Sequence, residues 1–281
     1  MESKLENFVT SNPDLPKIFS PSTSPTHRAQ LWESMCTHGE FLVDSYSWAC
    51  PNPRALRVLS AFQPLVEVGC GSNAYWGRRL RETGADIKCY DVDVEGGGVI
   101  DRPKKKIKQA GEDGGDGDFK ALKGGPEVLL EPGNLGRNLF LCFPDEDVNP
   151  SDPSGPPLGV ECLSNYSGEY VIHVGELFGE TVSHDQAPFG RSSSMEFQCH
   201  LAKDFHCILK AGLPRWPHEG QTISVWKRTT ICDIHFGDDE DDSGEEEVGE
   251  GEENKISFKH IPEDEALPQD IAAPCVAHLL K

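Results

Sequence analysis

Residues 64–91 read PLVEVGCGSNAYWGRRLRETGADIKCYD, and this stretch carries the strongest structural signal in the chain. Leu65–Val68 is a short apolar run typical of a buried parallel strand, and it stops at the glycine turn Gly69–Gly71. Tyr75–Thr83 has the apolar spacing of a helix, and Ile87–Tyr90 predicts a second strand. The stretch therefore predicts a β-α-β unit with a glycine-rich turn after its first strand.

Two acids accompany this turn. Asp91 lies about twenty residues beyond the glycines, where a carboxylate at the tip of the second strand can accept both hydroxyls of an adenosine ribose. Glu67 lies inside the first strand, and a carboxylate is costly to bury there unless it has partners. The spacing Gly69-x-Gly71-x-x-Ala74 also fits the dinucleotide fingerprint. These residues predict a site for a cofactor that contains a nucleoside.

The arrangement Glu67-x-Gly69-x-Gly71 resembles motif I of the class I S-adenosylmethionine-dependent methyltransferases. In that family the turn holds the amino-acid end of the cofactor, and the acid after the second strand holds the ribose. The resemblance implies S-adenosylmethionine as the cofactor. The residues expected to contact it are Glu67, Gly69, Gly71, Asn73, Asp91 and Cys142. Because the same β-α-β layout binds NAD, an NAD(P)-dependent oxidoreductase remains an alternative.

Further motifs resemble a methyltransferase-like family over most of residues 46–228. They are YSWA at Tyr46–Ala49, GGPE at Gly124–Glu127, LCFP at Leu141–Pro144 and VGE at Val174–Glu176. In amino-group methyltransferases the fourth strand is followed by Asp or Asn, two prolines and an aromatic residue. The residues CFPD at 142–145 depart from that pattern. The resemblance therefore implies neither an adenine substrate nor methyl transfer to an amino group.

In this reading the turn after the fourth strand faces the sulfonium and the substrate. Methyl transfer needs in-line positioning and desolvation, and Asp145 or Glu176 could remove a proton or hold the nucleophile. Acids at strand ends also serve as solvated residues or helix caps, so that alternative stays open. Tyr46, Trp48 and Pro144 are expected to bind the substrate. The methyl acceptor is left open among small molecules, proteins and nucleic acids.

The remaining patterns complete an α/β fold. Leu139–Phe143 and Tyr170–Val174 predict interior strands, and Thr222–Trp226 is predicted to pair with Ile231–Phe236 as an antiparallel hairpin at the sheet edge. The predicted class is a Rossmann-like open, mostly parallel sheet with helices on both faces and a C-terminal antiparallel β-hairpin. Further helices are predicted at Gln30–Asp44, Pro53–Phe62 and Glu196–Lys210.

Composition divides the chain into three parts. Residues 1–30 are expected to be a Pro/Ser-rich flexible lead-in, and 31–236 a methyltransferase-like domain with a low-complexity insertion at 96–117. Residues 237–281 are expected to be an acidic, largely disordered tail, because 237–253 contain eleven acids and no base. This tail is either a solubilising segment or a dock for a basic partner. The net charge of −21 argues against nonspecific binding to a phosphate backbone.

The N-terminal residues lack the profile of a signal peptide, and no apolar run is long enough to cross a bilayer. Ten cysteines without a C-x-x-C pair indicate reduced thiols, so a cytoplasmic or nuclear location is expected. The cysteine and histidine pairs between Cys199 and His235 have spacing that disfavours a zinc site, so no metal is predicted. A third hypothesis is a noncatalytic scaffold of the same fold, with Ile256–Ile261 and Ile271–Leu280 as partner-binding segments.

Overall fold

The computed structural model describes eight stretches of the chain, and the description below is confined to them. They are residues 1–71, 73–94, 119–144, 155–180, 192–214, 220–235, 255–266 and 272–281. The predicted insertion at 96–117, the acidic run at 237–253 and the predicted catalytic residue Asp145 lie outside these described residues.

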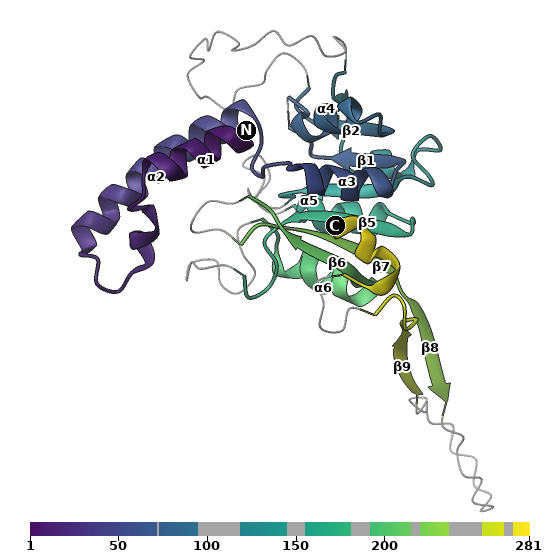
Figure 1. The fold of residues 1–281 in the computed structure, drawn as a ribbon. Coiled ribbons are helices and arrows are strands. Elements are labelled where there is room, and N and C mark those ends of the chain that lie inside the picture. Colours follow the sequence, from purple (N-terminus) through teal and green to yellow (C-terminus); the bar gives the residue numbers. More distant parts are fainter. Residues whose placement is uncertain are drawn as a thin grey trace, which may run out of the picture.

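A seven-stranded sheet forms the centre of the molecule, with the order β3-β2-β1-β4-β5-β7-β6 (Figure 1). The strands β1 to β5 are mutually parallel, and β7 runs antiparallel between β5 and β6. Their bounds are β1 Leu65–Val68, β2 Ile87–Asp91, β3 Leu122–Lys123, β4 Asn138–Cys142, β5 Tyr170–Gly175, β6 Phe205–Gly212 and β7 Thr222–Arg228. This sheet confirms the predicted open, mostly parallel α/β class.

Helices cover both faces of the sheet, and each face has its own apolar core. Alternate residues of a strand point to opposite faces, so Leu65 joins one core and Val66 the other. The first core also holds side chains of α3 (Pro53–Ala61), α4 (Tyr75–Glu82) and the 3₁₀-helix η3 (Pro274–Leu280). The second core holds side chains of α5 (Leu158–Asn165), α6 (Met195–Asp204) and the 3₁₀-helix η2 (Pro126–Leu130).

A helical hairpin precedes this domain. Helix α1 (Glu2–Ser11), the 3₁₀-helix η1 (Leu15–Phe19) and α2 (Pro25–Ser45) lie side by side and have a small core of their own (Figure 1). Residues 1–30 therefore differ from the flexible lead-in that their composition suggested. No helix of the described residues is long and apolar enough to span a membrane.

The start of α2 explains this difference. Ser24 caps the helix, because its hydroxyl accepts the backbone N–H of His27 at 3.3 Å, and Pro25 occupies the first helical position. The Ser-Pro pair that looked like part of an extended segment is therefore a helix start.

Two predicted elements near the C-terminus are wrong in part. The helix predicted at Glu196–Lys210 ends at Asp204, and the chain continues as strand β6. Strand β7 pairs with β6 and β5 and is not paired with Ile231–Phe236. Instead, β8 (Thr230–His235) pairs antiparallel with β9 (Lys255–His260) in a separate two-stranded sheet. The predicted C-terminal antiparallel β-hairpin is therefore confirmed, with β9 in place of β7 as the partner strand. The spacing of the apolar residues after Asp204 fits both a helix and a strand. The chain forms a strand here because residues 205–212 pair with β7 along its whole length.

The C-terminal residues complete the main domain. The N–H of Ala273 donates to the Ile208 carbonyl at 2.6 Å, and Ala272 bridges Leu209, so this segment covers the edge strand β6. Ala272, Ala273 and Val276 belong to the first core. Within the stretch 237–281, residues 255–260 form β9 and residues 274–280 form η3. The predicted partner-binding segment Ile271–Leu280 is largely used within the chain, because its apolar residues pack on the sheet domain.

Substitution of η3 tests this assignment. We expect Val276→Asp to lower the free energy of unfolding by roughly 3 kcal/mol, because it places a carboxylate in the first core. The matched control is Ala277→Asp, which adds the same charge at the neighbouring exposed position and should change stability by less than about 0.5 kcal/mol. Urea unfolding measures both values. Equal effects of the two substitutions would show that the C-terminal segment does not pack on the domain.

Candidate cofactor site

The turn after β1 forms the floor of the candidate site. Gly69 and Gly71 both have positive φ angles, of 77° and 71°, which favour glycine. A Cβ on Gly69 would lie only 2.8 Å from Leu158 Cδ2, so this position also needs glycine for packing. A Cβ on Gly71 would meet no atom of the described chain within 4 Å. Gly71 therefore has open space above it, into which a ligand can approach the backbone.

Asp91 ties the end of β2 to this turn. Its Oδ2 atom accepts the N–H of Gly71 at 2.8 Å, and its Oδ1 atom accepts the N–H of Asp93 at 3.0 Å. A carboxylate has about four acceptor positions, so two protein hydrogen bonds leave capacity for further donors. The two hydrogen bonds fix the orientation of the carboxylate at the strand end. A carboxylate that binds sugar hydroxyls must be oriented in this way.

Glu67 is the buried acid beside the turn. Its side chain is 1% exposed, and the Cys89 thiol donates to its Oε2 atom at 3.0 Å. Burial raises the pKa of Glu67 to about 7, and the hydrogen bond from Cys89 offsets part of this rise. Burial, and then the hydrogen bond with Cys70, raises the pKa of the Cys89 thiol well above its ordinary value. Glu67 can therefore hold or release a proton near neutral pH.

The strand register places three predicted site residues on one face of the sheet. Glu67 lies opposite Cys89 of β2 on one side and opposite Phe140 of β4 on the other. Two residues further along these strands, Asp91 and Cys142 point to the same face at the carboxyl edge. The structure thus brings Glu67, Asp91 and Cys142 together, although they lie far apart in the sequence.

The Asn73 side chain forms hydrogen bonds within the chain. Its Nδ2 atom donates to the Tyr46 carbonyl at 2.8 Å, and its Oδ1 atom accepts the N–H of Tyr75 at 3.0 Å. The Tyr46 and Tyr75 rings meet edge to face, with centroids 5.2 Å apart. Asn73 therefore fastens the end of α2 to the start of α4, and its predicted contact with a cofactor stays a prediction.

Trp48 lies beside the turn after β4. Its ring stacks on Phe143 at a centroid distance of 6.1 Å and an interplanar angle of 16°, and 37% of its surface is exposed. Phe143 has a positive φ of 53°, and Pro144 follows it as a buried residue. The carbonyl of Trp48 accepts the Gln221 side-chain amide at 3.3 Å. The predicted substrate residues Trp48 and Pro144 therefore both lie near the end of β4, while the Tyr46 carbonyl is bonded to Asn73 beside the glycine turn.

Glu176, predicted to be catalytic, occupies a buried position at the end of β5. Its Oε1 atom accepts the N–H of Gly220 at 2.8 Å, and its own N–H donates to Ser192 Oγ at 2.7 Å. These bonds link β5 to the segment that enters β7, which is a structural role. The catalytic role of Glu176 stays a prediction, as does that of Asp145.

His173 is a buried polar residue that the sequence reasoning missed. Neither of its ring nitrogens has a hydrogen-bond partner among the described residues, and its ring lies 5.4 Å from that of Phe197. Burial alone lowers its pKa from 6.5 to about 3. Its position in the middle of the apolar strand YVIHVG was the available signal. His173 lies on the α6 face, opposite the face that carries Glu67.

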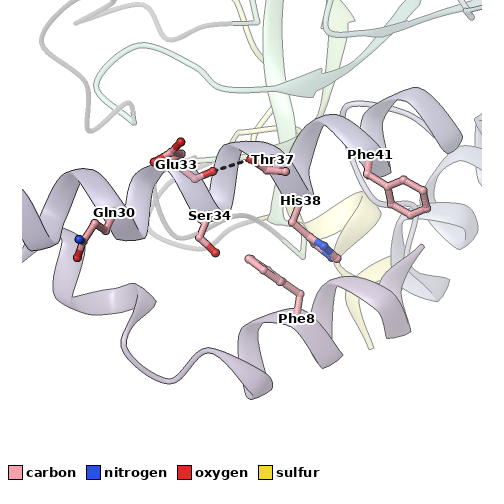
Figure 2. A pocket seen from close by; sticks show the side chains of 7 residues that line it. All are labelled: Phe8, Gln30, Glu33, Ser34, Thr37, His38 and Phe41. Carbon is pink, nitrogen blue, oxygen red and sulfur yellow. Dashed lines mark hydrogen bonds between the residues drawn. The ribbon is translucent and has the colours of Figure 1, made fainter. Parts of the chain in front are cut away.

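An open hollow of about 640 Å³ lies in the helical hairpin. Figure 2 shows the Phe8 ring of α1 stacked on His38 of α2, with a centroid distance of 4.0 Å. The hollow is lined by Phe8, Gln30, Glu33, Ser34, Thr37, His38 and Phe41. All of these residues belong to α1 and α2, so the hollow is separate from the strand ends. Among the described residues, no group of three or more His, Cys, Asp or Glu side chains could hold a metal ion.

The topology identifies the type of fold. The sheet runs 3-2-1-4-5 as in a doubly wound domain, and it closes with an antiparallel strand pair at the edge beyond β5. The described strands therefore form a doubly wound, mostly parallel α/β sheet with an antiparallel edge.

Two of the solved structures to which the chain is similar are methyltransferases. One is a magnesium protoporphyrin IX methyltransferase from Synechocystis PCC 6803 with bound S-adenosylmethionine, at 10% identity and a TM-score of 0.36, covering 81% of this chain and 96% of that one. The other is a methyltransferase from Aquifex aeolicus described as dependent on S-adenosylmethionine, at 15% identity and a TM-score of 0.34, covering 63% and 93%. No protein-family model and no curated protein matches the chain.

The state of His173 predicts a pH dependence of stability. The folded chain favours the neutral ring, so this contribution is fully present above the unfolded pKa of 6.5 and is lost as the pH falls toward 3. We expect the wild type to lose stability relative to His173→Leu by up to about 1.4 kcal/mol per pH unit in that window. Urea unfolding at pH 7.5 and pH 5.0 measures the difference. Glu67 titrates in both proteins and so cancels, and a constant difference across these two conditions would contradict the assignment.

Proposed function

We propose that the chain binds S-adenosylmethionine at the carboxyl edge of β1, β2 and β4 and acts as a methyltransferase. The observation that carries this proposal is the Gly71–Asp91 hydrogen bond, which places an open glycine turn and an oriented carboxylate side by side. The glycine turn suits the amino-acid end of the cofactor, and the Asp91 carboxylate suits the ribose hydroxyls.

The chemistry of the nearby side chains fits this cofactor. S-adenosylmethionine carries a positive sulfonium and a positive amino group, and both Glu67 and Asp91 lie on the same face of the sheet. The Trp48–Phe143 stack supplies an apolar wall at the next strand end. A water-excluding wall of this kind favours the transfer of a methyl group from a cation, because water stabilises the charged ground state.

The reaction itself requires little from the protein beyond position. Bound S-adenosylmethionine supplies an electrophilic methyl group, and the chain must hold an acceptor in line with it. Trp48 and Pro144 are the residues that we assign to acceptor binding, with Tyr46 at the entrance beside the glycine turn. Asp145 is the preferred acid for proton removal, since the Glu176 carboxylate is engaged by Gly220. The acceptor class stays open among small molecules, proteins and nucleic acids, and a cytoplasmic or nuclear location is part of this proposal.

Two observations favour a second candidate, a noncatalytic scaffold with the same fold. Glu176 is buried in protein hydrogen bonds, and the CFPD sequence at 142–145 departs from the amino-group methyltransferase pattern. A scaffold of this kind would either retain cofactor binding without turnover or lose both. A measurement of cofactor binding, followed by a measurement of turnover, distinguishes the two candidates.

Calorimetric titration with S-adenosylmethionine and its demethylated product tests the cofactor, with NAD and NADP titrated in parallel. We expect saturable binding of the first pair, with dissociation constants in the micromolar range, and no saturable binding of the nicotinamide cofactors. Tighter binding of NAD or NADP would assign the site to an oxidoreductase. The absence of binding by all four compounds would favour the scaffold.

Paired glycine substitutions test the location of the site. Gly71 and Gly84 both have positive φ angles and no atom of the described chain within 4 Å of an added Cβ, so valine strains the two turns similarly. We expect Gly71→Val to weaken the affinity for S-adenosylmethionine at least tenfold, and Gly84→Val to leave it within about twofold. Asp91→Ala should also weaken it, through loss of the ribose contacts. Unchanged affinity in folded Gly71→Val would place the cofactor elsewhere.

A further inference from the structure

The β8–β9 hairpin extends away from the seven-stranded sheet (Figure 1). It consists of two strands only, and several of its large apolar side chains are exposed. Ile234 is 46% exposed, Ile256 is 54% exposed and Phe258 is 44% exposed. A two-stranded sheet is marginally stable in water unless another element packs on it. The hairpin thus exposes apolar side chains, and a partner that covered them would stabilise it.

The strand register sorts the hairpin into two chemically different faces. Directly paired residues of an antiparallel ladder share a face, so Ile234 with Ile256 and Cys232 with Phe258 lie together on one face, with the polar pair Thr230–His260 at its base. The opposite face carries the pairs Ile231–Lys259, Asp233–Ser257 and His235–Lys255. We refer to Cys232, Ile234, Ile256 and Phe258 as the apolar face.

The hairpin contacts the main domain through Lys259, which pairs with Ile231 on the opposite face near the base of the hairpin. Lys259 donates to the carbonyl of Phe205 at 2.7 Å and also to that of Ala202, at the junction of α6 and β6. Asp233 accepts the Ser257 hydroxyl at 2.7 Å and pairs with Lys255 at 3.1 Å. The side chains of Ile234, Ile256 and Phe258 are themselves exposed, so the apolar face lies open to the solvent.

The dimensions of the apolar face suit a helix. Each strand has six residues, and six residues at about 3.4 Å per residue span roughly 20 Å. A helix of about 14 residues has the same length at 1.5 Å per residue. A strand added to the hairpin edge would extend the sheet and leave its face uncovered, whereas an amphipathic helix packs across a sheet face. The missing layer is therefore best supplied by a helix.

The charge of the chain selects the partner. The sequence that connects β8 to β9 contains eleven acids and no base within residues 237–253. A second copy carries the same acidic residues, and like charges repel. A basic partner would instead be attracted to the acidic chain. We propose that the apolar face binds an amphipathic helix of another protein, with an apolar stripe flanked by Lys or Arg.

Peptide binding to the full chain tests this proposal. The probe is a fluorescent 14-residue Leu/Lys peptide with leucine at helical spacing, and the measurement is fluorescence anisotropy. Two control peptides are a Leu/Glu peptide with the same spacing and a Leu/Lys peptide of the same composition with alternating leucine. We expect saturable binding of the helical Leu/Lys peptide, at least tenfold tighter than binding of either control. Equal affinity for both Leu/Lys peptides would contradict recognition of a helix.

Substitutions locate the binding face. The double variant Ile256→Thr, Phe258→Thr keeps the net charge and the β-propensity, and we expect it to lose at least tenfold in affinity. The matched control is Ile231→Thr, which removes an equally exposed isoleucine from the opposite face and should keep affinity within about twofold. Equal losses in both variants, or no loss in the double variant, would overturn the proposal.

Two further measurements keep the test independent of hairpin folding. A photo-crosslinker on the helical peptide should attach to residues 230–235 or 255–260 of the wild type, and attachment elsewhere would overturn the assignment. Sedimentation velocity should show a monomer at the concentrations used. A dimer that dissociates in the double variant would assign the apolar face to a second copy and would equally overturn the proposal.

Discussion

The parallel pairing of β1 with β2 on one side and with β4 on the other fixes where the candidate site residues lie. Because the strands run the same way, their carboxyl ends meet at one edge, and the register aligns Glu67 with Cys89 and Phe140. That edge carries the glycine turn, Asp91 and Cys142. The Gly71–Asp91 hydrogen bond closes this arrangement by joining the turn to the neighbouring strand end.

Two buried ionisable groups lie on opposite faces of the same sheet and respond to pH in opposite directions. The raised pKa of Glu67 gives a contribution to stability that is fully present below pH 4.5 and is lost as the pH rises through about 7. The lowered pKa of His173 gives one that is present above pH 6.5 and is lost on acidification. Glu67 lies next to the glycine turn, on the face of the first core. His173 lies on the opposite face, beside Phe197 of α6.

The N-terminal helical hairpin is tied to the same edge of the sheet. The amino group of Met1 lies 3.4 Å from the Tyr75 hydroxyl, and Lys4 lies over the Tyr46 ring at 5.1 Å. Asn73 adds its bond to the Tyr46 carbonyl. The hairpin is therefore placed beside the start of α4. At the opposite end of the chain, the C-terminal residues protect the edge strand β6.

The sequence by itself determined the β-α-β unit, the glycine turn with Asp91, and the open, mostly parallel α/β class. These features depend on local spacing and on glycine conformation, which neighbouring residues specify. Only the tertiary structure decided that Phe205–Gly212 is a strand, because its apolar spacing suits a helix as well and its pairing with β7 is a long-range contact. The same holds for Asn73 and Glu176, whose polar groups are used by distant backbone atoms. The packing of residues 272–281 on the sheet also depends on surfaces that form only when the chain folds.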